Sequence, residues 1–204
     1  MRVLELFAGT HSVGKVCEEL GYEVVSLDLK GADINIDILE WDYKKDYKPG
    51  DFSAIWSSPP CHTFSHVRRC WINRKLKIFG DEVVTAKMLD DDMEQNGLPI
   101  LRKTEEIINY FKPDRWIIEN PSTGKMKDYL QHLPSYDIDY CRYSSWGYKK
   151  PTRIWTNKED FNALKCNGNC GNMVGNKHKS SLKDLHTLEE RYRVPPKLIK
   201  ELLI

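Results

Sequence analysis

Two short polar strings, each placed directly after a run that reads as a buried strand, constrain this chain most. Ser58-Pro59-Pro60-Cys61 follows the apolar residues 52–56, and Glu119-Asn120-Pro121 follows residues 115–118. In an open α/β sheet, chemistry takes place just outside the carboxyl ends of the strands. A thiol in the first string and a carboxylate in the second therefore predict two catalytic groups that face one pocket: a nucleophile and a group that donates or accepts a proton. For Cys61 taken alone, the competing interpretation is a buried structural cysteine.

The first forty residues have the layout of a nucleotide-binding βαβ unit. Strands are expected at residues 2–7 and 22–27, with a helix at residues 13–20 between them, because the apolar residues change from strand-like to helical spacing. Asp28 follows the second strand, where an acid suits the hydroxyls of a ribose; a turn or helix-capping aspartate is the alternative. The pattern predicts an α/β fold of Rossmann-like form, with a mostly parallel central sheet and helices on both faces.

Further strands are expected at residues 34–36, 136–143 and 153–156, and further helices at residues 99–111 and 196–204. Residues 62–98 are polar, and their pattern is irregular. A loop of this length inside a compact domain is usually functional or mobile. The sequence therefore predicts a functional loop after the first string.

A chain of 204 residues is long enough for one domain with a full core. We expect that core to span residues 1–160, with a short basic segment, residues 161–204, packed on the same domain. The net charge is −6 over residues 1–140 and +7 over residues 141–204. A basic third suits a polyanion such as DNA as the partner, and a solvated charged surface is the alternative.

The printed sequence has no apolar run long enough to span a membrane, and its first residues lack the pattern of a cleavable signal. Six cysteines without such a signal are typical of a reducing cytosol, where thiols catalyse or bind metal more often than they pair. We therefore expect no membrane partner and a cytoplasmic location (the cytoplasm of the host cell, if a phage encodes the chain).

A set of motifs, in order along the chain, resembles those of the cytosine carbon-5 DNA methyltransferases, in a short form like those of phages and large DNA viruses. The motifs are Phe7-Ala8-Gly9, Asp28 with Asp37-Ile38, Pro60-Cys61-His62-Thr63-Phe64-Ser65, Glu119-Asn120-Pro121 and Arg153-Ile154-Trp155. Any one of them alone is weak. The ordered set across residues 3–155 is specific, and it implies the Rossmann-like fold of methyltransferases that use S-adenosylmethionine.

The resemblance implies a catalytic role for four residues. A Cys61 thiolate would attack carbon 6 of a cytosine extruded from the duplex, and Glu119 would protonate ring nitrogen 3. Asn120 would hold the Cys61 loop, and Arg153 would contact the cytosine carbonyl oxygen. The residues implied in binding the cofactor S-adenosylmethionine are Phe7, Ala8, Gly9, Thr10, His11, Ser12, Asp28, Leu29, Asp37, Ile38 and Pro59.

The chain departs from the family pattern at three places. In the late motif, Lys150-Pro151-Thr152 precedes a single Arg153, whereas the family usually has a Gln and two arginines. His11 and Ser12 stand where the family prefers glycines, which affects the packing around the methionine end of the cofactor. Only about twenty residues separate Trp155 from the apparent closing motifs, where family members insert a target-recognition domain. Sequence selectivity is therefore expected to be short or weak, or supplied by a protein partner. Phosphate contacts are expected from the basic C-terminal third and from Arg68, Arg69 and Arg74.

A second constellation has the spacing of a metal site. Cys166 and Cys170 form a Cys-x3-Cys pair, and His178 lies eight residues further on. The spacing and the glycines between them permit a tetrahedral zinc site, with Cys141 and His186 as candidates for a further ligand. The alternative is two reduced thiols in a loop rich in asparagine and glycine.

Three functions are compatible with these patterns. The favoured one is methylation of cytosine carbon 5 in DNA; a second is the same chemistry on RNA. The third is a catalytically idle DNA-binding or regulatory protein on the same scaffold. The presence of both Cys61 and Glu119 speaks against this last function, because binding alone needs neither residue.

Overall fold

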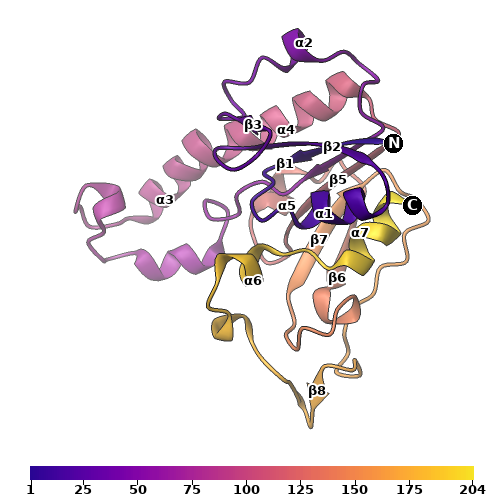
Figure 1. Ribbon diagram of the computed structural model, residues 1–204. Helices are drawn as coiled ribbons and strands as arrows, with labels where there is room; N and C mark the ends of the chain where they lie inside the picture. Colours follow the sequence, from indigo (N-terminus) through magenta and orange to yellow (C-terminus); the bar gives the residue numbers. More distant parts are fainter.

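A seven-stranded sheet forms the centre of the computed structural model, which describes residues 1–204 (Figure 1). The strands are β1 (Arg2–Leu6), β2 (Glu23–Asp28), β3 (Ile34–Asn35), β4 (Ala54–Ser57), β5 (Arg115–Pro121), β6 (Ser135–Asp139) and β7 (Pro151–Thr156). Their order across the sheet is β3-β2-β1-β4-β5-β7-β6. The first five in that order are parallel, and β7 is antiparallel to both of its neighbours.

This order puts a ligand crevice next to the predicted strings. The order of the strands reverses between β1 and β4, so the loops after these two strands leave the carboxyl edge in opposite directions. In open α/β sheets, ligands bind in the crevice at such a switch point. The architecture confirms the predicted Rossmann-like α/β fold with a mostly parallel sheet.

Helices cover both faces of the sheet. They are α1 (Ser12–Glu19), α2 (Tyr43–Asp46), α3 (Ala86–Asp92), α4 (Leu98–Phe111), α5 (Met126–Tyr129), α6 (Leu188–Tyr192) and α7 (Pro196–Leu203). The long helix α4 packs on one face, and α1 and α7 contact each other on the other face (Figure 1).

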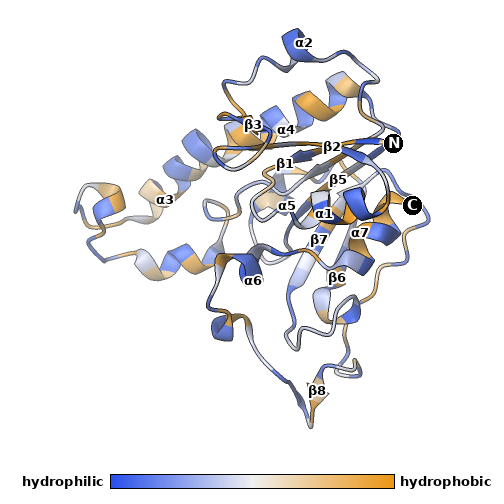
Figure 2. Ribbon diagram, viewed as in Figure 1, coloured by the Kyte–Doolittle hydropathy of each residue, from blue (hydrophilic) through white to orange (hydrophobic).

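Each face of the sheet has its own hydrophobic core, because successive side chains of a strand point to opposite faces. Leu4 packs with Phe111 of α4, whereas its neighbour Val3 packs with Leu198 of α7. These four side chains are fully buried. Helices α4 and α7 carry both hydrophobic and hydrophilic residues, as a helix that covers a sheet requires (Figure 2). Burial of each such side chain contributes about 1.5–3 kcal/mol.

The prediction of an irregular loop over residues 62–98 was wrong in its second half. α3 continues through one π-helical turn, Met93–Gly97, directly into α4. Leu89, Met93 and Leu98 are all buried although they are spaced four and five residues apart. A π turn contains one residue more than an α turn, so it returns the third of these side chains to the core side. A search for regular helical spacing misses such a segment.

The strand predicted at residues 136–143 is shorter than expected. β6 ends at Asp139, and a 3-10 turn, Tyr140–Arg142, follows it. The last residue pair of the β6–β7 ladder joins Asp139 to Pro151. Proline has no backbone N–H to donate, so the ladder ends there.

Residues 161–204 pack in two different ways. α7 belongs to the core on the α1 face of the sheet. Residues 166–180, by contrast, extend away from the sheet and end in a small hairpin of β8 (Met173–Val174) and β9 (Lys177–His178), at the bottom of Figure 1. Along the whole chain, no helix has the length and apolar character that a membrane span requires.

Candidate active site

Cys61 lies in the loop that leaves β4 at the carboxyl edge of the sheet. Ser57, the last residue of β4, pairs with Leu6 of β1 on one side and Ile118 of β5 on the other. The loop therefore starts between two central strands, and two prolines, Pro59 and Pro60, restrict its backbone. Cys61 is half-buried, which leaves its thiol reachable from the crevice.

Hydrogen bonds anchor this loop on both sides of Cys61. The Asn120 side chain donates a buried hydrogen bond of 2.7 Å to the Pro59 carbonyl, the kind of contact expected for Asn120. Beyond the thiol, the Phe64 ring is buried in the core, and its carbonyl accepts the Lys125 N–H at 2.8 Å. The position of the thiol is thus set by β5 on one side and by the core beneath α4 on the other.

Glu119 lies in β5, with only 6% of its surface exposed. Its Oε1 accepts the hydroxyl of the fully buried Tyr140 at 2.8 Å and lies 3.8 Å from the Lys150 ammonium. The Lys150 ammonium also lies 4.7 Å from the centre of the Tyr140 ring. Sequence reasoning missed both partners. The available signal was Lys150 itself, next to Pro151, where the late motif departs from its usual residues.

The surroundings of Cys61 favour the neutral thiol in the free protein. Burial raises the pKa of Cys61, and the nearby Glu119 carboxylate raises it further. The Lys150 ammonium and a backbone hydrogen bond act in the opposite direction and lower the pKa. The charges of Glu119 and Lys150 thus act on the pKa of the Cys61 thiol in opposite directions.

Arg153 points toward a different partner. On β7, it pairs in register with Asn120 of β5 and with Asp137 of β6. Its Nε and Nη2 donate to the two carboxylate oxygens of Asp137 at 2.7 and 3.0 Å. This bidentate ion pair holds the guanidinium at the β6 side of β7, whereas Glu119 is contacted by Tyr140 and Lys150.

The turn after β1 brings together the residues expected to bind the cofactor. The N–H groups of Phe7 and Ala8 both donate to the Leu27 carbonyl of β2, at 2.8 and 3.1 Å. Phe7, Gly9 and His11 have φ values of 62°, 51° and 55°, in the left-handed region that costs energy for any residue except glycine. Beneath the turn, Glu5 accepts the N–H groups of the first turn of α1. Backbone strain of this kind is typical of binding sites.

Asp28 ties the end of β2 to that turn. Its two oxygens accept the Gly9 N–H at 2.8 Å and the Leu29 N–H at 2.6 Å. An ionised carboxylate offers about four acceptor sites, so two remain for the hydroxyls of a ribose. Asp28 is half-buried, and the half-buried ring of Phe7 lies in the same turn. An aromatic ring and a carboxylate at adjacent strand ends fit the nucleoside part of S-adenosylmethionine.

The remaining expected cofactor residues lie in varied environments. The Thr10 and Ser12 hydroxyls hydrogen-bond to each other at 2.9 Å within the turn. Asp37 starts a turn by accepting the Leu39 N–H at 2.9 Å. Ile38 is buried in the core, and Leu29 is 65% exposed. Pro59, buried after β4, completes the set at the carboxyl edge.

Only part of the predicted basic loop is free for phosphates. Arg69 and Arg74 are exposed, as expected for contacts with a polyanion. Arg68 is 5% exposed, and its guanidinium makes a salt bridge to Asp92 and a hydrogen bond to the Thr63 carbonyl. The expectation of a phosphate contact from Arg68 was therefore wrong. Its partner Asp92 belongs to α3, a helix within a stretch whose sequence pattern is irregular.

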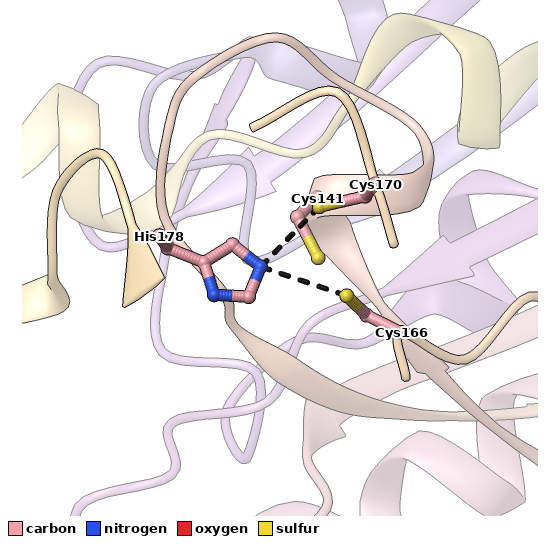
Figure 3. Close-up of side chains that lie close together, drawn as sticks. All are labelled: Cys141, Cys166, Cys170 and His178. Atoms are coloured by element: carbon pink, nitrogen blue, oxygen red, sulfur yellow. Dashed lines mark hydrogen bonds between the residues drawn. The ribbon is translucent and has the colours of Figure 1, made fainter. Parts of the chain in front are cut away.

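The cysteines and the histidine of the predicted metal site lie together in one cluster. The ligand atoms of Cys141, Cys166, Cys170 and His178 all lie within 4.8 Å of one another (Figure 3). The Nε2 atom of His178 lies 3.3 Å from the Cys170 sulfur and 3.6 Å from the Cys166 sulfur. Of the two further candidates, the structure brings in Cys141, whereas His186 is exposed and outside the cluster.

The fold and the residues at the carboxyl edge define the class of this protein. It is a Rossmann-like α/β protein with a cysteine after β4 and a buried glutamate in β5. No family model matches the chain. The "Probable DNA (cytosine-5)-methyltransferase" of Frog virus 3 (isolate Goorha) is 45% identical to it, over all of this chain and 99% of the viral protein. This chain belongs to the DNA (cytosine-5)-methyltransferase family.

Two solved structures are also similar. A mutant of DNMT2 from Spodoptera frugiperda is 14% identical, with 81% of this chain and 53% of that chain covered and a TM-score of 0.47. An S-adenosylmethionine-dependent methyltransferase from Archaeoglobus fulgidus is 11% identical, with 76% and 84% covered and a TM-score of 0.41.

Proposed function

We propose that this chain transfers a methyl group from S-adenosylmethionine to carbon 5 of cytosine in DNA, through a covalent bond between Cys61 and carbon 6 of the ring. The observation that carries the proposal is the geometry of the carboxyl edge: the Asn120 hydrogen bond to the Pro59 carbonyl ties the Cys61 loop to β5, where the buried Glu119 lies 3.8 Å from the Lys150 ammonium. Membership of the DNA (cytosine-5)-methyltransferase family supports the same reaction.

The reaction needs a nucleophile because carbon 5 of cytosine is too electron-poor to accept a methyl group unaided. The Cys61 thiolate adds to carbon 6, and the electrons of the 5,6 double bond move to carbon 5. S-adenosylmethionine, when bound, supplies the methyl group. A base then takes the carbon-5 proton, the electron pair of that C–H bond re-forms the 5,6 double bond, and the thiolate leaves carbon 6.

Glu119 is proposed as the acid that protonates ring nitrogen 3, where negative charge develops during the addition. Its Oε1 is occupied by the Tyr140 hydroxyl and faces Lys150, which leaves Oε2 for the ring. The Asn120 bond to the Pro59 carbonyl links the thiol loop to the strand that carries Glu119. Nucleophile and acid therefore keep a fixed separation without help from substrate.

The cofactor would bind along the turn after β1. We propose that Asp28 accepts the ribose hydroxyls, that Phe7 stacks on the adenine, and that Asp37 lies beside the adenine end. The backbone of the turn and the neighbouring side chains complete the binding surface: Ala8, Gly9, Thr10, His11, Ser12, Leu29, Ile38 and Pro59. Arg153 is proposed to reach the cytosine carbonyl oxygen, which requires it to share its ion pair with Asp137.

DNA would be held mainly by phosphate contacts. Positive charge is exposed in two places. One is the loop after Cys61, with Arg69 and Arg74, and the other is the C-terminal segment, with the lysines of residues 165–183. The target base must leave the helical stack, because the thiol cannot reach carbon 6 inside it. Phosphate contacts do not read bases, so methylation is expected in a context of a few base pairs, or in a longer one when a protein partner supplies specificity.

Affinity for DNA is expected to fall steeply with salt concentration, because each phosphate that is neutralised releases condensed counterions. Two further elements belong to the proposal. One is activity in the cytoplasm of the host cell, which agrees with six free cysteines. The other is a zinc ion bound by Cys166, Cys170 and His178.

A covalent trap tests the central step. DNA containing 5-fluorocytosine should form a complex with the protein and S-adenosylmethionine that survives denaturation, because fluorine at carbon 5 cannot leave as a proton does. Cys61→Ser should give no such complex. Cys70→Ser is the matched control: Cys70 is also a free cysteine but lies exposed nine residues along the same loop, and its loss should leave the complex intact.

A complex that persists in Cys61→Ser would reject Cys61 as the nucleophile. Analysis of modified nucleosides after incubation with DNA or with RNA identifies the polymer. Methylcytosine in RNA alone would replace DNA as the substrate, and methylcytosine in neither polymer would indicate the idle binding protein.

A further inference from the structure

The outer part of the C-terminal segment, residues 162–186, is poorly supplied with apolar side chains. Only Cys166, Cys170, Asn172 and Leu185 are buried there. Ala163 and Leu164 pack against the core on the α1 face of the sheet, and beyond them the only hydrophobic cluster consists of three cysteines with Met173 packed against them. So small a cluster buries too little surface to hold some twenty-five residues in one conformation, and segments of this kind usually depend on disulfides or a metal. All three cysteines are free thiols.

The geometry of the cluster fits a metal ion. Figure 3 shows three sulfur atoms and the Nε2 atom of His178 pointing toward a common centre. In a tetrahedral zinc site, with bonds of about 2.3 Å to sulfur and 2.0–2.1 Å to nitrogen, the sulfur–nitrogen separation is about 3.6 Å. The corresponding separations here are 3.6 Å for Cys166 and 3.3 Å for Cys170. Thiolate and imidazole donors together favour zinc among the common metals.

Hydrogen bonds hold the ligand-bearing backbone in place from outside the cluster. The Cys166 N–H donates to the buried Asp139 carboxylate at 2.8 Å. The buried Asn172 side chain donates to the Cys141 and Ser144 carbonyls at 2.9 and 2.8 Å and accepts the Gly147 N–H at 3.1 Å. Outer contacts of this sort orient the ligands of real metal sites.

We infer that Cys141, Cys166, Cys170 and His178 form a four-ligand structural zinc site. Four protein ligands close the tetrahedron, so no position remains for water or substrate, and the ion has no part in the chemistry. Cys141 lies in the turn directly after β6, whereas the other three ligands belong to the C-terminal segment. The ion therefore fastens the outer part of that segment to the end of the central sheet, one residue from Tyr140.

Metal content tests the inference without any use of methyltransferase activity. The full chain, purified with zinc present and dialysed against metal-free buffer, should retain one zinc per chain by mass spectrometry of the elements. Cys170→Ser and His178→Ala should each lower that content sharply. His186→Ala, which changes an exposed histidine of the same segment, and Cys70→Ser, which changes an exposed cysteine elsewhere, should keep it. Loss of zinc in these two controls would overturn the assignment.

A spectroscopic measurement on the unmodified chain covers the case in which ligand variants fail to fold. Replacement of the ion by Co²⁺ should give intense visible bands of a tetrahedral site and sulfur-to-cobalt charge-transfer bands. Weak octahedral bands without charge transfer, less than one metal per five chains, or a disulfide between any two of the three cysteines in the intact mass would each overturn the inference. A positive result stands even if no DNA methylation is found.

Discussion

The carboxyl edge of the sheet and the outer C-terminal segment are held together by different forces. At the edge, Cys61 follows β4 and Glu119 lies within β5. The side chains of these strands are buried on both faces, in clusters of 20 and 17 buried residues. In the segment, the corresponding cluster has three members, all cysteines. Apolar burial positions the first region, whereas polar contacts and the proposed zinc site position the second.

This difference teaches where mutations act. At the sheet edge, the fold does not depend on the reactive groups, because strands β4 and β5 are fixed by packing. A change of Cys61 or Glu119 should therefore alter chemistry and leave stability intact. In the segment, the reactive groups are themselves the structural support, so the same type of change should release the chain locally.

The largest effect is expected at the sheet edge. Glu119→Gln should slow methyl transfer by about 10²–10⁴-fold, the usual contribution of a positioned acid or base. Gln fills the same volume in β5, so the melting temperature and cofactor affinity should barely change. Initial rates and a thermal scan of the two proteins measure both. A melting temperature that falls together with the rate would show that Glu119 supports the fold, which breaks the comparison.

The next largest effect distinguishes apolar packing of the core from the cysteine cluster of the C-terminal segment. Leu198→Ala in α7 should lower the free energy of unfolding of the whole molecule by about 2–5 kcal/mol, because it leaves a cavity in a packed core. Cys170→Ser should leave the urea midpoint of the sheet nearly unchanged. It should instead speed tryptic cleavage after the exposed Lys165, Lys177 and Lys179.

Limited proteolysis and urea titration of the same samples give the required pair of measurements. Equal loss of global stability in Leu198→Ala and Cys170→Ser would mean that the segment is part of the main cooperative unit.

A pH effect of intermediate size is expected from Glu5. Burial beneath α1 raises the pKa of Glu5 to about 7, against the lowering effect of the Gly14 and Val13 N–H groups. Between pH 4.5 and 7 the folded protein keeps a proton that the unfolded chain releases, so this group lowers the free energy of unfolding as pH rises, by up to about 3 kcal/mol.

Glu5→Gln cannot ionise and should lose that part of the pH dependence, although it keeps only one acceptor for two donors. Urea titrations at pH 5 and pH 8 give the change in the free energy of unfolding between the two pH values for each protein. Identical pH dependence in the two proteins would exclude Glu5 as its source.

The smallest effect is expected in cofactor binding. Asp28→Ala should weaken the binding of S-adenosylmethionine by about 1.5–3 kcal/mol, as for the loss of hydrogen bonds to a charged group. Asp42→Ala, which removes an exposed carboxylate before α2, is the control and should bind normally. Calorimetry on both variants provides the comparison. Unchanged affinity in a folded Asp28→Ala would remove Asp28 from the site.

The sequence predicted the sheet edge well because proline and short apolar runs mark the strand ends locally. The family resemblance implied that Asn120 holds the Cys61 loop, and its side chain donates to the Pro59 carbonyl. Tyr140 and Lys150 could not be found in this way, since their meeting depends on the turn between β6 and β7, where the Tyr140 N–H donates to the Lys150 carbonyl at 3.2 Å.

Long-range pairing explains the other differences. Arg68 looks like a surface residue in the sequence, and only its pairing with Asp92, 24 residues away, takes it out of solvent. In the metal cluster, spacing alone left Cys141 and His186 equal as further ligands. The end of β6 decides between them, because it brings Cys141 to the other two cysteines.

The π-helical turn at Met93–Gly97 makes this part of the chain sensitive to length rather than to composition. The extra residue in the turn keeps the buried faces of α3 and α4 aligned; if the same residues formed a regular α-helix, α3 would rotate by about 100° relative to α4. Asp92 would then turn away from Arg68, and Asp90 would leave Lys125, from which it is 2.7 Å away. Arg68 and Lys125 both anchor the loop after Cys61. A one-residue insertion into this helix should therefore release the loop by rotating α3, whereas a one-residue deletion within the turn should be tolerated, because it leaves a regular α-helix with the same buried face.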